Sequence, residues 1–295
     1  MNRKLAILLA LVLLLGAFLT VGCSPDSIDE DEKTVLRLGA VPGEEEQKRR
    51  DQYQPFVEYL ERELGVEVEL FVGSDYTATV EAMRSNKIDL VWYGPLSYLL
   101  AADIADAEAF ALSYDSELGV FYESYIIVHA DSDIYEIADL KGKTFAFVDP
   151  ASTGGHLIPR HQMVDAGLDP DADLESMVFV GGHDACAEAV KNKHVDGAAI
   201  VRHMFERGVE AERIDEEELR IIAVSDPFPG GPLAYRRSLD EGLKEAIRHA
   251  IFNMPDEDVQ ANLEVFGSRH LRFEEADDAL FDTLREASKL IDLDL

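Results

Sequence analysis

The stretch VEVELFVGSDYTATVEAMRSNKIDLVWYG, Val66 to Gly94, decides the fold. Its first seven residues alternate largely between apolar and polar side chains, as in a strand with one buried face. The following segment, SDYTATVEAMRSNKI, predicts a helix with Ser74 or Asp75 as its N-cap. The residues DLVWYG then predict a second, buried strand. Strand, helix and strand at this spacing form a βαβ unit, whose two strands run parallel in one sheet.

The same alternation of strands and helices continues on both sides of this unit. Strands are expected at 34–43, at 122–130, at 144–149, at 177–182, from 195 and from 220. Helices are expected at about 44–64, 95–102, 154–167, 183–194, 240–252, 256–266 and 274–291. Two α/β groups, with further elements after the second, predict two α/β lobes joined by crossing strands. We expect residues 35–130 plus 224–295 in lobe 1 and residues 131–223 in lobe 2, with a ligand cleft between them at the strand ends.

The chain is strongly acidic. It has 59 acidic and 27 basic residues among 295, for a net charge of -32. Such a surface repels phosphate backbones and anionic lipids, so no nucleic-acid partner is expected. The acidic residues are spread along the chain, as in IDEDEK, GEEEQ and IDEEELR. Plain solubility accounts for this pattern; so does a halophilic adaptation to high salt, in which self-repulsion is screened, and we favour the second interpretation.

The N-terminus predicts export from the cytoplasm. Two basic residues precede an uncharged apolar run from Leu5 to Val21, as in a secretory signal. The segment Thr20-Val21-Gly22-Cys23 resembles a bacterial lipobox, which implies a lipoprotein signal peptide at 1–22 and lipidation of Cys23. An uncleaved membrane anchor and an ordinary signal peptide remain alternatives. Residues 23–34 are polar and acidic, which predicts a flexible tether. Each alternative places the rest of the chain outside the cytoplasm.

A loop after one expected strand has the composition of an anion site. DPASTGGHLIP, Asp149 to Pro159, combines two hydroxyls with two glycines at the start of an expected helix. Ser152 and Thr153 can donate O–H bonds to an oxyanion, and Gly154 lets the backbone approach closely. The N–H groups at a helix start carry partial positive charge and bind anions without a cationic side chain. A simple capping turn explains one hydroxyl and one glycine but not two of each.

Three further strand ends offer hydrogen-bond donors. VGGHDACAEAV places His183 after two glycines at a helix start. Tyr76 and Tyr93 follow two other strands, each with a phenol hydroxyl and an apolar ring. The alternative is that these are capping, core or rim residues. Cys186 lies between alanines and predicts a buried, inert thiol. The chain lacks the common catalytic and zinc motifs, so no catalytic residue, metal or cofactor is expected.

The chain resembles the substrate-binding proteins of phosphate, phosphite and phosphonate ABC importers, which have the type II periplasmic-binding-protein fold. The resemblance covers most of residues 35–270. It depends on SDYTATVEAMRSNKIDLVWYGPLSYL, DPASTGGHLIP, GGHDACAEAVKNKHVDGA and SDPFPGGPLAYRRSL. It implies that Tyr76, Tyr93, Ser152, Thr153 and His183 contact the ligand, and that the backbone of Gly154 replaces a third hydroxyl.

Two positions depart from the family pattern. Relatives that bind aminoethylphosphonate hold its amine with two acids, whose positions correspond here to His203 and Gly231. An ammonium group would lose both partners, so aminoalkylphosphonates are disfavoured. His203 is a further candidate ligand residue. It and Arg202 would add positive charge if they faced the cleft; the alternative is that both face solvent.

Together these features predict an extracytoplasmic, monomeric solute-binding lipoprotein, anchored to the membrane through its N-terminal lipid. It would bind phosphate, phosphite or a simple phosphonate and deliver it to an ABC transporter permease. Three alternatives stay open: a sensing module for a signalling partner, a binder of another oxyanion, and an extracytoplasmic phosphoester enzyme.

Overall fold

The structure is a computed structural model that describes residues 34–42, 46–267 and 269–289. The predicted signal peptide, Cys23 and nearly all of the predicted tether lie outside the described residues. All elements given below belong to one compact unit, Val35–Leu295. Within the described ranges, none of the helices combines the length and the apolar character needed to cross a membrane.

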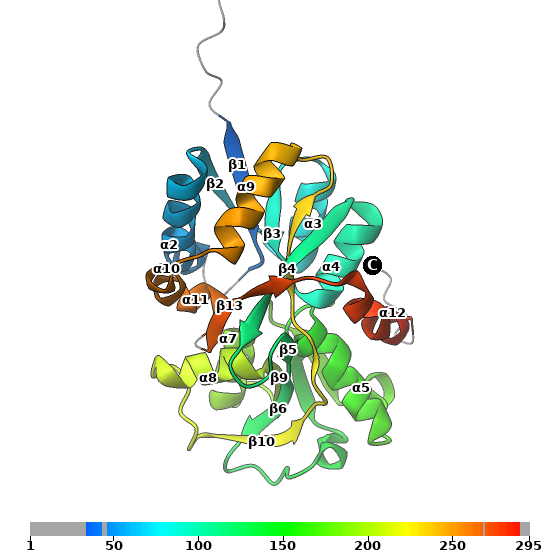
Figure 1. Ribbon diagram of the computed structural model, residues 1–295. Helices are drawn as coiled ribbons and strands as arrows, with labels where there is room; N and C mark the ends of the chain where they lie inside the picture. The colour runs from blue at the N-terminus through cyan, green and yellow to red at the C-terminus, as the bar shows by residue number, and fades with distance from the viewer. Residues whose placement is uncertain (1–33, 43–45, 268, 290–295) are drawn as a thin grey trace, which may run out of the picture. The chain divides into compact units, whose positions relative to one another are not determined.

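The first sheet has six strands in the order β13-β4-β12-β3-β1-β2 (Figure 1). Pairs β1–β2 and β1–β3 are parallel, and the other three pairs are antiparallel. The strands are β1 (Val35–Ala40), β2 (Glu67–Val72), β3 (Leu90–Trp92), β4 (Ala107–Asp115), β12 (Pro232–Arg236) and β13 (His270–Glu275). The predicted βαβ unit is confirmed: α3 (Tyr76–Arg84) joins β2 to β3, and the Asp75 carboxylate caps it by accepting from Ala78 N at 2.7 Å.

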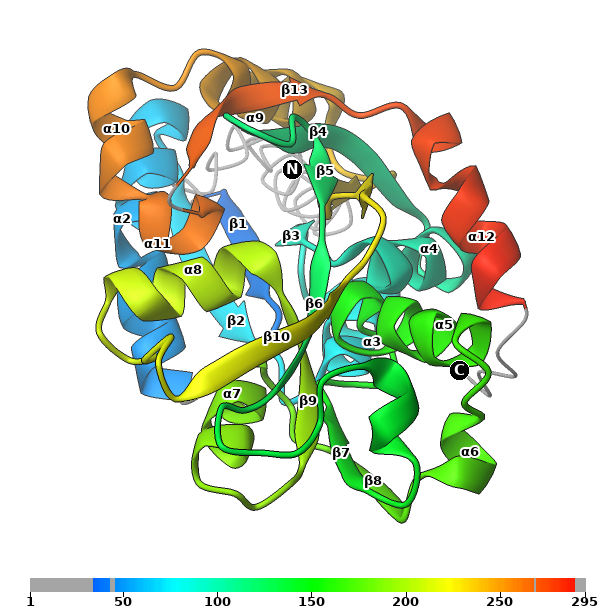
Figure 2. The same cartoon turned by 90° about the horizontal axis from the view of Figure 1, so that it is seen from below.

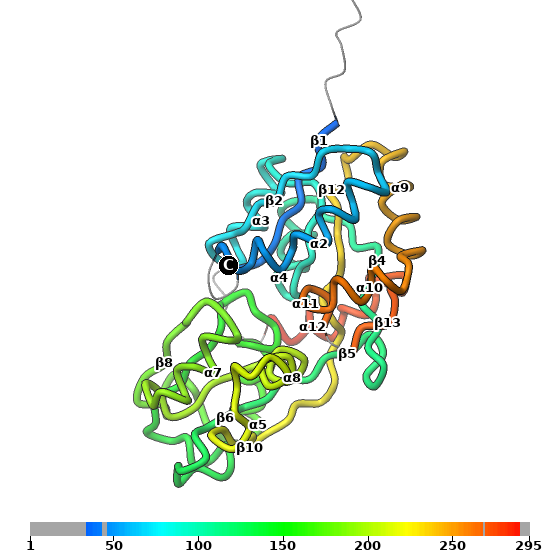
Figure 3. Tube along the Cα trace, turned by 90° about the vertical axis from the view of Figure 1, so that its left-hand side faces the viewer, coloured from blue at the N-terminus to red at the C-terminus, as the bar shows by residue number. Residues whose placement is uncertain are grey.

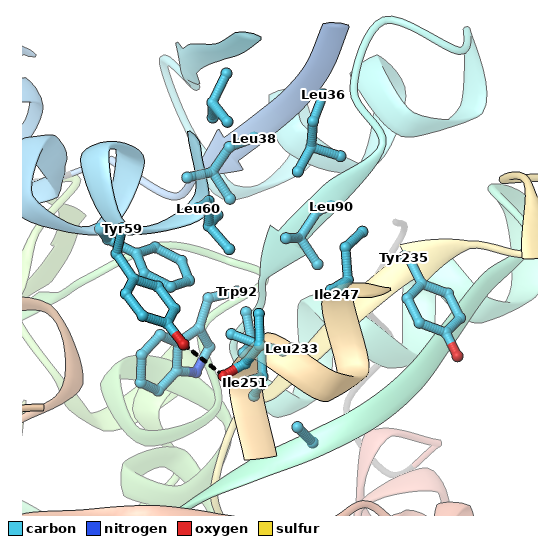
Figure 4. Close-up of a cluster of buried hydrophobic side chains, with 14 of the residues drawn as sticks. Leu36, Leu38, Tyr59, Leu60, Leu90, Trp92, Leu233, Tyr235, Ile247 and Ile251 are labelled. Atoms are coloured by element: carbon cyan, nitrogen blue, oxygen red, sulfur yellow. Dashed lines mark hydrogen bonds between the residues drawn. The ribbon is translucent and has the colours of Figure 1, made fainter. Parts of the chain in front are cut away.

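Helices cover both faces of the first sheet. Because side chains alternate along β3, Leu90 and Trp92 pack with α2 (Glu46–Leu64) and α9 (Glu241–Phe252). Val91 instead packs with α3 and α4 (Pro95–Ile104) on the other face. Figure 4 shows the first of these cores, in which the buried Tyr59 hydroxyl donates to the carbonyl of Ala250 at 2.6 Å. This bond ties α2 to α9 across the core.

The second sheet has five strands in the order β10-β6-β9-β7-β8. They are β6 (Ser124–His129), β7 (Thr144–Phe147), β8 (Ser176–Phe179), β9 (Gly197–Val201) and β10 (Leu219–Val224). One face packs against α7 (His183–Lys191) and α8 (Arg202–Glu210), and the other against α5 (Ile158–Asp165). Cys186 is fully buried in the first of these cores, and burial raises the pKa of its thiol, as a buried, inert cysteine requires.

A short ribbon connects the two sheets. Strands β5 (Phe121–Tyr122) and β11 (Phe228–Pro229) pair antiparallel between them, as Figures 1 and 3 show. The chain leaves the first sheet through β5 and returns through β11, so the predicted crossing strands are confirmed. The predicted lobe boundaries stay a prediction. The pairing does show that β6, within the range assigned to lobe 1, belongs to the second sheet.

Several predicted elements have different bounds. The expected strand at 122–130 is divided at Glu123, where the chain passes from the ribbon into the second sheet. The expected helix at 274–291 is wrong at its start, because β13 extends to Glu275 and pairs with β4. The helix expected at 256–266 is divided at Asn262. The remaining elements are η2 (Ile137–Leu140), the π-helical turn η3 (Thr153–Leu157), α6 (Pro170–Asp173), α10 (Asp256–Ala261), α11 (Leu263–Phe266), η4 (Asp278–Phe281) and α12 (Asp282–Ser288).

Candidate functional site

A cavity of about 100 Å³ lies between the two sheets. A volume of roughly 10–15 Å³ on this measure holds one water, so the cavity has room for a small molecule. Its walls come from segments that follow the carboxyl ends of strands in both sheets, where α/β folds bind ligands. All seven ligand residues predicted from the sequence line it: Tyr76, Tyr93, Ser152, Thr153, Gly154, His183 and His203.

The hydroxyl loop, Ser152 to Gly154, opens the π-helical turn η3. Ser152 is its N-cap, and its hydroxyl oxygen accepts from Gly155 N at 3.0 Å. The hydroxyl oxygen of Thr153 accepts from Leu96 N at 2.8 Å, which joins this loop to α4 on the first sheet. A hydroxyl that accepts keeps its own proton for donation. Both side chains are therefore held in place. The Thr153 hydroxyl can still donate to an anion in the cavity, and so can one hydroxyl of the hydrogen-bonded pair Ser152 and Tyr76.

The two glycines of this loop are explained by packing. A Cβ on Gly154 would overlap Val201 Cγ1 and lie 3.0 Å from Phe228 Cζ. A Cβ on Gly155 would overlap the Val148 side chain. The sequence predicted that glycine would let the backbone approach a ligand here. In the structure, the nearest side chains are instead those of Val201 in β9 and of Val148, which follows β7. Glycine here allows η3 to lie directly against the sheet.

The two tyrosines differ in what their hydroxyls offer. Tyr76 is the first residue of α3. Burial raises the pKa of its phenol to about 12, and a hydrogen bond with the Ser152 side chain opposes that shift. Its phenol is therefore neutral and adjacent to the hydroxyl loop. The Tyr93 hydroxyl donates to the carbonyl of Thr79 on α3 at 3.2 Å. Its single proton is engaged inside the core, so Tyr93 contributes its ring and its backbone to the cavity wall.

Both candidate histidines are neutral; His183 is buried and His203 is partly buried. Burial, with His203, Arg207 and Arg49 adding to it, lowers the pKa of His183 to about 3. Its Nδ1 accepts from Val201 N at 3.3 Å, which leaves the proton on Nε2 as a donor. Burial and Arg207 likewise lower the pKa of His203 to about 3, and its ring lies 4.4 Å from the Tyr122 ring. His203 therefore lines the cavity, but its imidazole is neutral and does not supply the positive charge that the sequence analysis considered.

Arg202 does not line the cavity. It forms ion pairs with Glu117, Glu123 and Glu206 at 2.6–3.0 Å. Of the two possibilities left open by the sequence, Arg202 does not face this cavity, because surrounding carboxylates hold its guanidinium elsewhere.

Acid should destabilise the fold. Burial lowers the pKa of four histidines, namely His156, His183, His203 and His270. An unfolded histidine titrates near 6.5, so below that pH the unfolded chain binds more protons than the native one. The stability contributed by these neutral histidines is fully present above pH 6.5 and is lost progressively as the pH falls towards 3.

We expect the free energy of unfolding in urea to fall between pH 7.5 and 5.5, by on the order of 1 kcal/mol per histidine. The substitution His203→Gln should flatten this dependence; equal stability at both pH values would contradict it.

Two arginines in the cavity wall were missed by the sequence reasoning. Arg49 on α2 and Arg207 on α8 are 8% and 6% exposed, and both line the cavity. One signal was available for Arg49, since it lies one helical turn before Tyr53 on a stripe that continues with Phe56 and Leu60. A charged residue on the buried stripe of a helix points to a partner or a site. The cavity therefore contains cationic side chains, which the sequence-based interpretation had considered unnecessary.

Known proteins are similar to this chain over most of its length. A family profile described as "ABC transporter, phosphonate, periplasmic substrate-binding protein" matches residues 38–281. The phosphonates-binding periplasmic protein of Escherichia coli (strain K12) is 33% identical over 257 residues, covering 86% of this chain and 75% of that protein. The phosphate-import protein PhnD of Mycolicibacterium smegmatis is 31% identical over 249 residues, covering 81% and 78%. A crystal structure of a binding protein component of a Pseudomonas aeruginosa ABC phosphonate transporter matches with a TM-score of 0.80 at 27% identity, covering 88% of this chain and 87% of that one. The chain therefore belongs to the periplasmic substrate-binding proteins of phosphonate ABC transporters.

Proposed function

We propose that this protein captures a phosphorus oxyanion in the cavity between its two sheets and delivers it to an ABC transporter permease. The ligand is phosphate, phosphite or a phosphonate, and the Ser152–Gly154 loop holds its oxygens. The lobes, predicted as 35–130 plus 224–295 and as 131–223 but with β6 in the second sheet, close around it by bending at the β5–β11 ribbon. The protein acts as a monomer, tethered to the membrane through a lipid on Cys23, and its acidic surface suits a saline surrounding.

The convergence of neutral donors on one small cavity is the observation that supports this proposal. The hydroxyls of Ser152 and Thr153, the phenol of Tyr76 and the imidazole N–H of His183 all belong to cavity-lining residues. The backbone N–H groups of Thr153 and Gly154 lie in the first turn of η3, where a helix leaves its N–H groups without an earlier carbonyl. Charge-assisted bonds of about 1.5–3 kcal/mol each give tight binding when several converge.

We propose binding rather than turnover. The imidazoles of His183 and His203 stay neutral through neutral pH, and the Tyr76 phenol keeps its proton. Fixed protonation states suit a site that donates hydrogen bonds to an anion and releases it unchanged. They do not suit general acid–base catalysis, which needs a group whose pKa lies near the working pH.

A ligand panel tests the proposal. The melting temperature of the purified protein is measured with phosphate, phosphite, methylphosphonate, 2-aminoethylphosphonate and sulfate. Ligands that bind the native state raise the apparent stability by mass action. We expect a phosphorus oxyanion without an ammonium group to give the largest shift. A larger shift with sulfate, or none with any phosphorus compound, would refute the choice of ligand. Release of alcohol and phosphate from phosphoesters would refute the binding role.

A further inference from the structure

The two buried arginines of the cavity come from different parts of the fold. Arg49 lies on α2, which packs on the first sheet, and Arg207 lies on α8, which follows β9 of the second. Arg207 Nη1 donates to the carbonyl of Glu264 on α11, and α11 contacts α2. Burial raises the pKa of Tyr53, and both arginines oppose that shift, which places Tyr53 near the two. Both arginines therefore reach the cavity wall from the α2–α11 side.

Each of these two arginines donates a hydrogen bond to a backbone carbonyl. Arg49 Nη2 donates to the carbonyl of Pro42 at 3.0 Å, and Arg207 donates to that of Glu264. The Nε atom of each is buried and has no hydrogen-bond partner in the described part of the chain. Burial lowers the pKa of Arg207, and Asp184, which also lines the cavity, opposes that shift and offsets part of one charge. Two guanidiniums against one carboxylate leave this side of the cavity positive, in a chain with twice as many acids as bases.

The hydroxyl loop reaches the cavity wall from other elements of the fold. Figure 2 shows α2, α8 and α11 on one side and α4 and α5 on the other. Thr153 binds Leu96 of α4, and its turn η3 continues into α5. A phosphorus oxyanion on this loop has hydroxyls, N–H groups and helix starts that carry about half a positive charge each. It does not need two buried guanidiniums in addition, so the arginines have a separate role.

We propose that the ligand carries a second anionic group, a carboxylate that Arg49 and Arg207 bind while the hydroxyl loop binds the phosphonate. This inference rests on the proposed function. The planar guanidinium fork matches the two oxygens of a carboxylate. A cavity of about 100 Å³ limits the spacer to one or two carbons. The ligand class is therefore a short phosphonocarboxylate, and the carboxylate brings together two like charges that otherwise repel across the cleft.

The test compares three ligands of equal length by titration calorimetry at pH 7.5. 3-Phosphonopropionate ends in a carboxylate, propylphosphonate in a methyl group and 2-aminoethylphosphonate in an ammonium. We expect 3-phosphonopropionate to bind at least tenfold more tightly than propylphosphonate, and 2-aminoethylphosphonate to bind most weakly. This comparison uses the unmodified protein, so it does not depend on any variant folding.

Variants then assign the effect to the arginines. Arg49→Gln and Arg207→Gln should each weaken 3-phosphonopropionate binding at least tenfold and methylphosphonate binding less than threefold. Arg50→Gln is the matched control, because this neighbour pairs with Glu46 on the exposed surface of α2 and should change neither. If methylphosphonate or phosphate binds but the carboxylate gives no advantage, the inference is wrong and the proposed function stands. If no phosphorus compound binds, the proposed function fails.

Discussion

Removing both hydroxyls of the anion loop should weaken ligand binding by about 3–6 kcal/mol, a loss of more than about a hundredfold. The variant combines Ser152→Ala with Thr153→Val, which keeps the volume of the threonine. Each lost hydroxyl removes a charge-assisted bond to the ligand from a residue that is 2% exposed. The binding constant for the best ligand of the panel, measured by titration calorimetry, provides the readout.

Two controls separate binding from folding in this experiment. The Thr153 oxygen also accepts from Leu96 N, and the Ser152 oxygen caps η3, so the double variant should lose about 1–3 kcal/mol of stability. The substitution Thr153→Ser keeps the hydroxyl and should bind within a fewfold of the unmodified protein. A folded double variant with unchanged affinity would remove this loop from the ligand site.

The substitution Gly154→Ala should have a large effect on both stability and binding. The added methyl would overlap Val201 Cγ1, and inserting a group into packed structure costs about 1–3 kcal/mol or more. Relief requires η3 to move away from β9, which would carry the Ser152 and Thr153 hydroxyls out of position. We expect a lower melting temperature together with an affinity loss of at least tenfold.

A second substitution tests the cause of this effect. Val201→Ala removes the atom that the new methyl would meet, so the double variant Gly154→Ala with Val201→Ala should regain much of the lost stability. Gly242→Ala is the matched control. It lies in the first turn of α9, where the new methyl would meet only the Asp240 carboxylate at 3.1 Å. If Val201→Ala gives no rescue, or if Gly242→Ala is equally damaging, the packing explanation is wrong.

Local pattern was enough for a large part of this molecule. The alternation around α3 predicted a parallel βαβ unit, and Asp75 was one of the two caps proposed for it. The loop at Ser152 and the helix start at His183 were also identified. Each strand, helix and cap among these features is encoded within about 15 neighbouring residues, because strand and helix periods and capping chemistry act over that range. The two successive α/β groups also predicted two lobes, and the resemblance then implied the type II periplasmic-binding-protein fold.

The sequence did not predict the contacts made between distant segments. Strands β12 and β13 complete the first sheet by pairing with β3 and β4, more than 100 residues earlier in the chain. Tyr93 was placed at the right strand end, but the direction of its hydroxyl depends on α3 packing above it.

The cavity shows most clearly what only the tertiary structure decided. Each helix start carries its partial charge wherever it lies, so the sequence by itself was enough to predict anion-binding turns in this chain. It did not determine that Arg49 and Arg207, 158 positions apart, would be buried in one wall of the cavity with little carboxylate to balance them. The charge of a site depends on which side chains the folded chain removes from water together, and that is set by packing across both sheets.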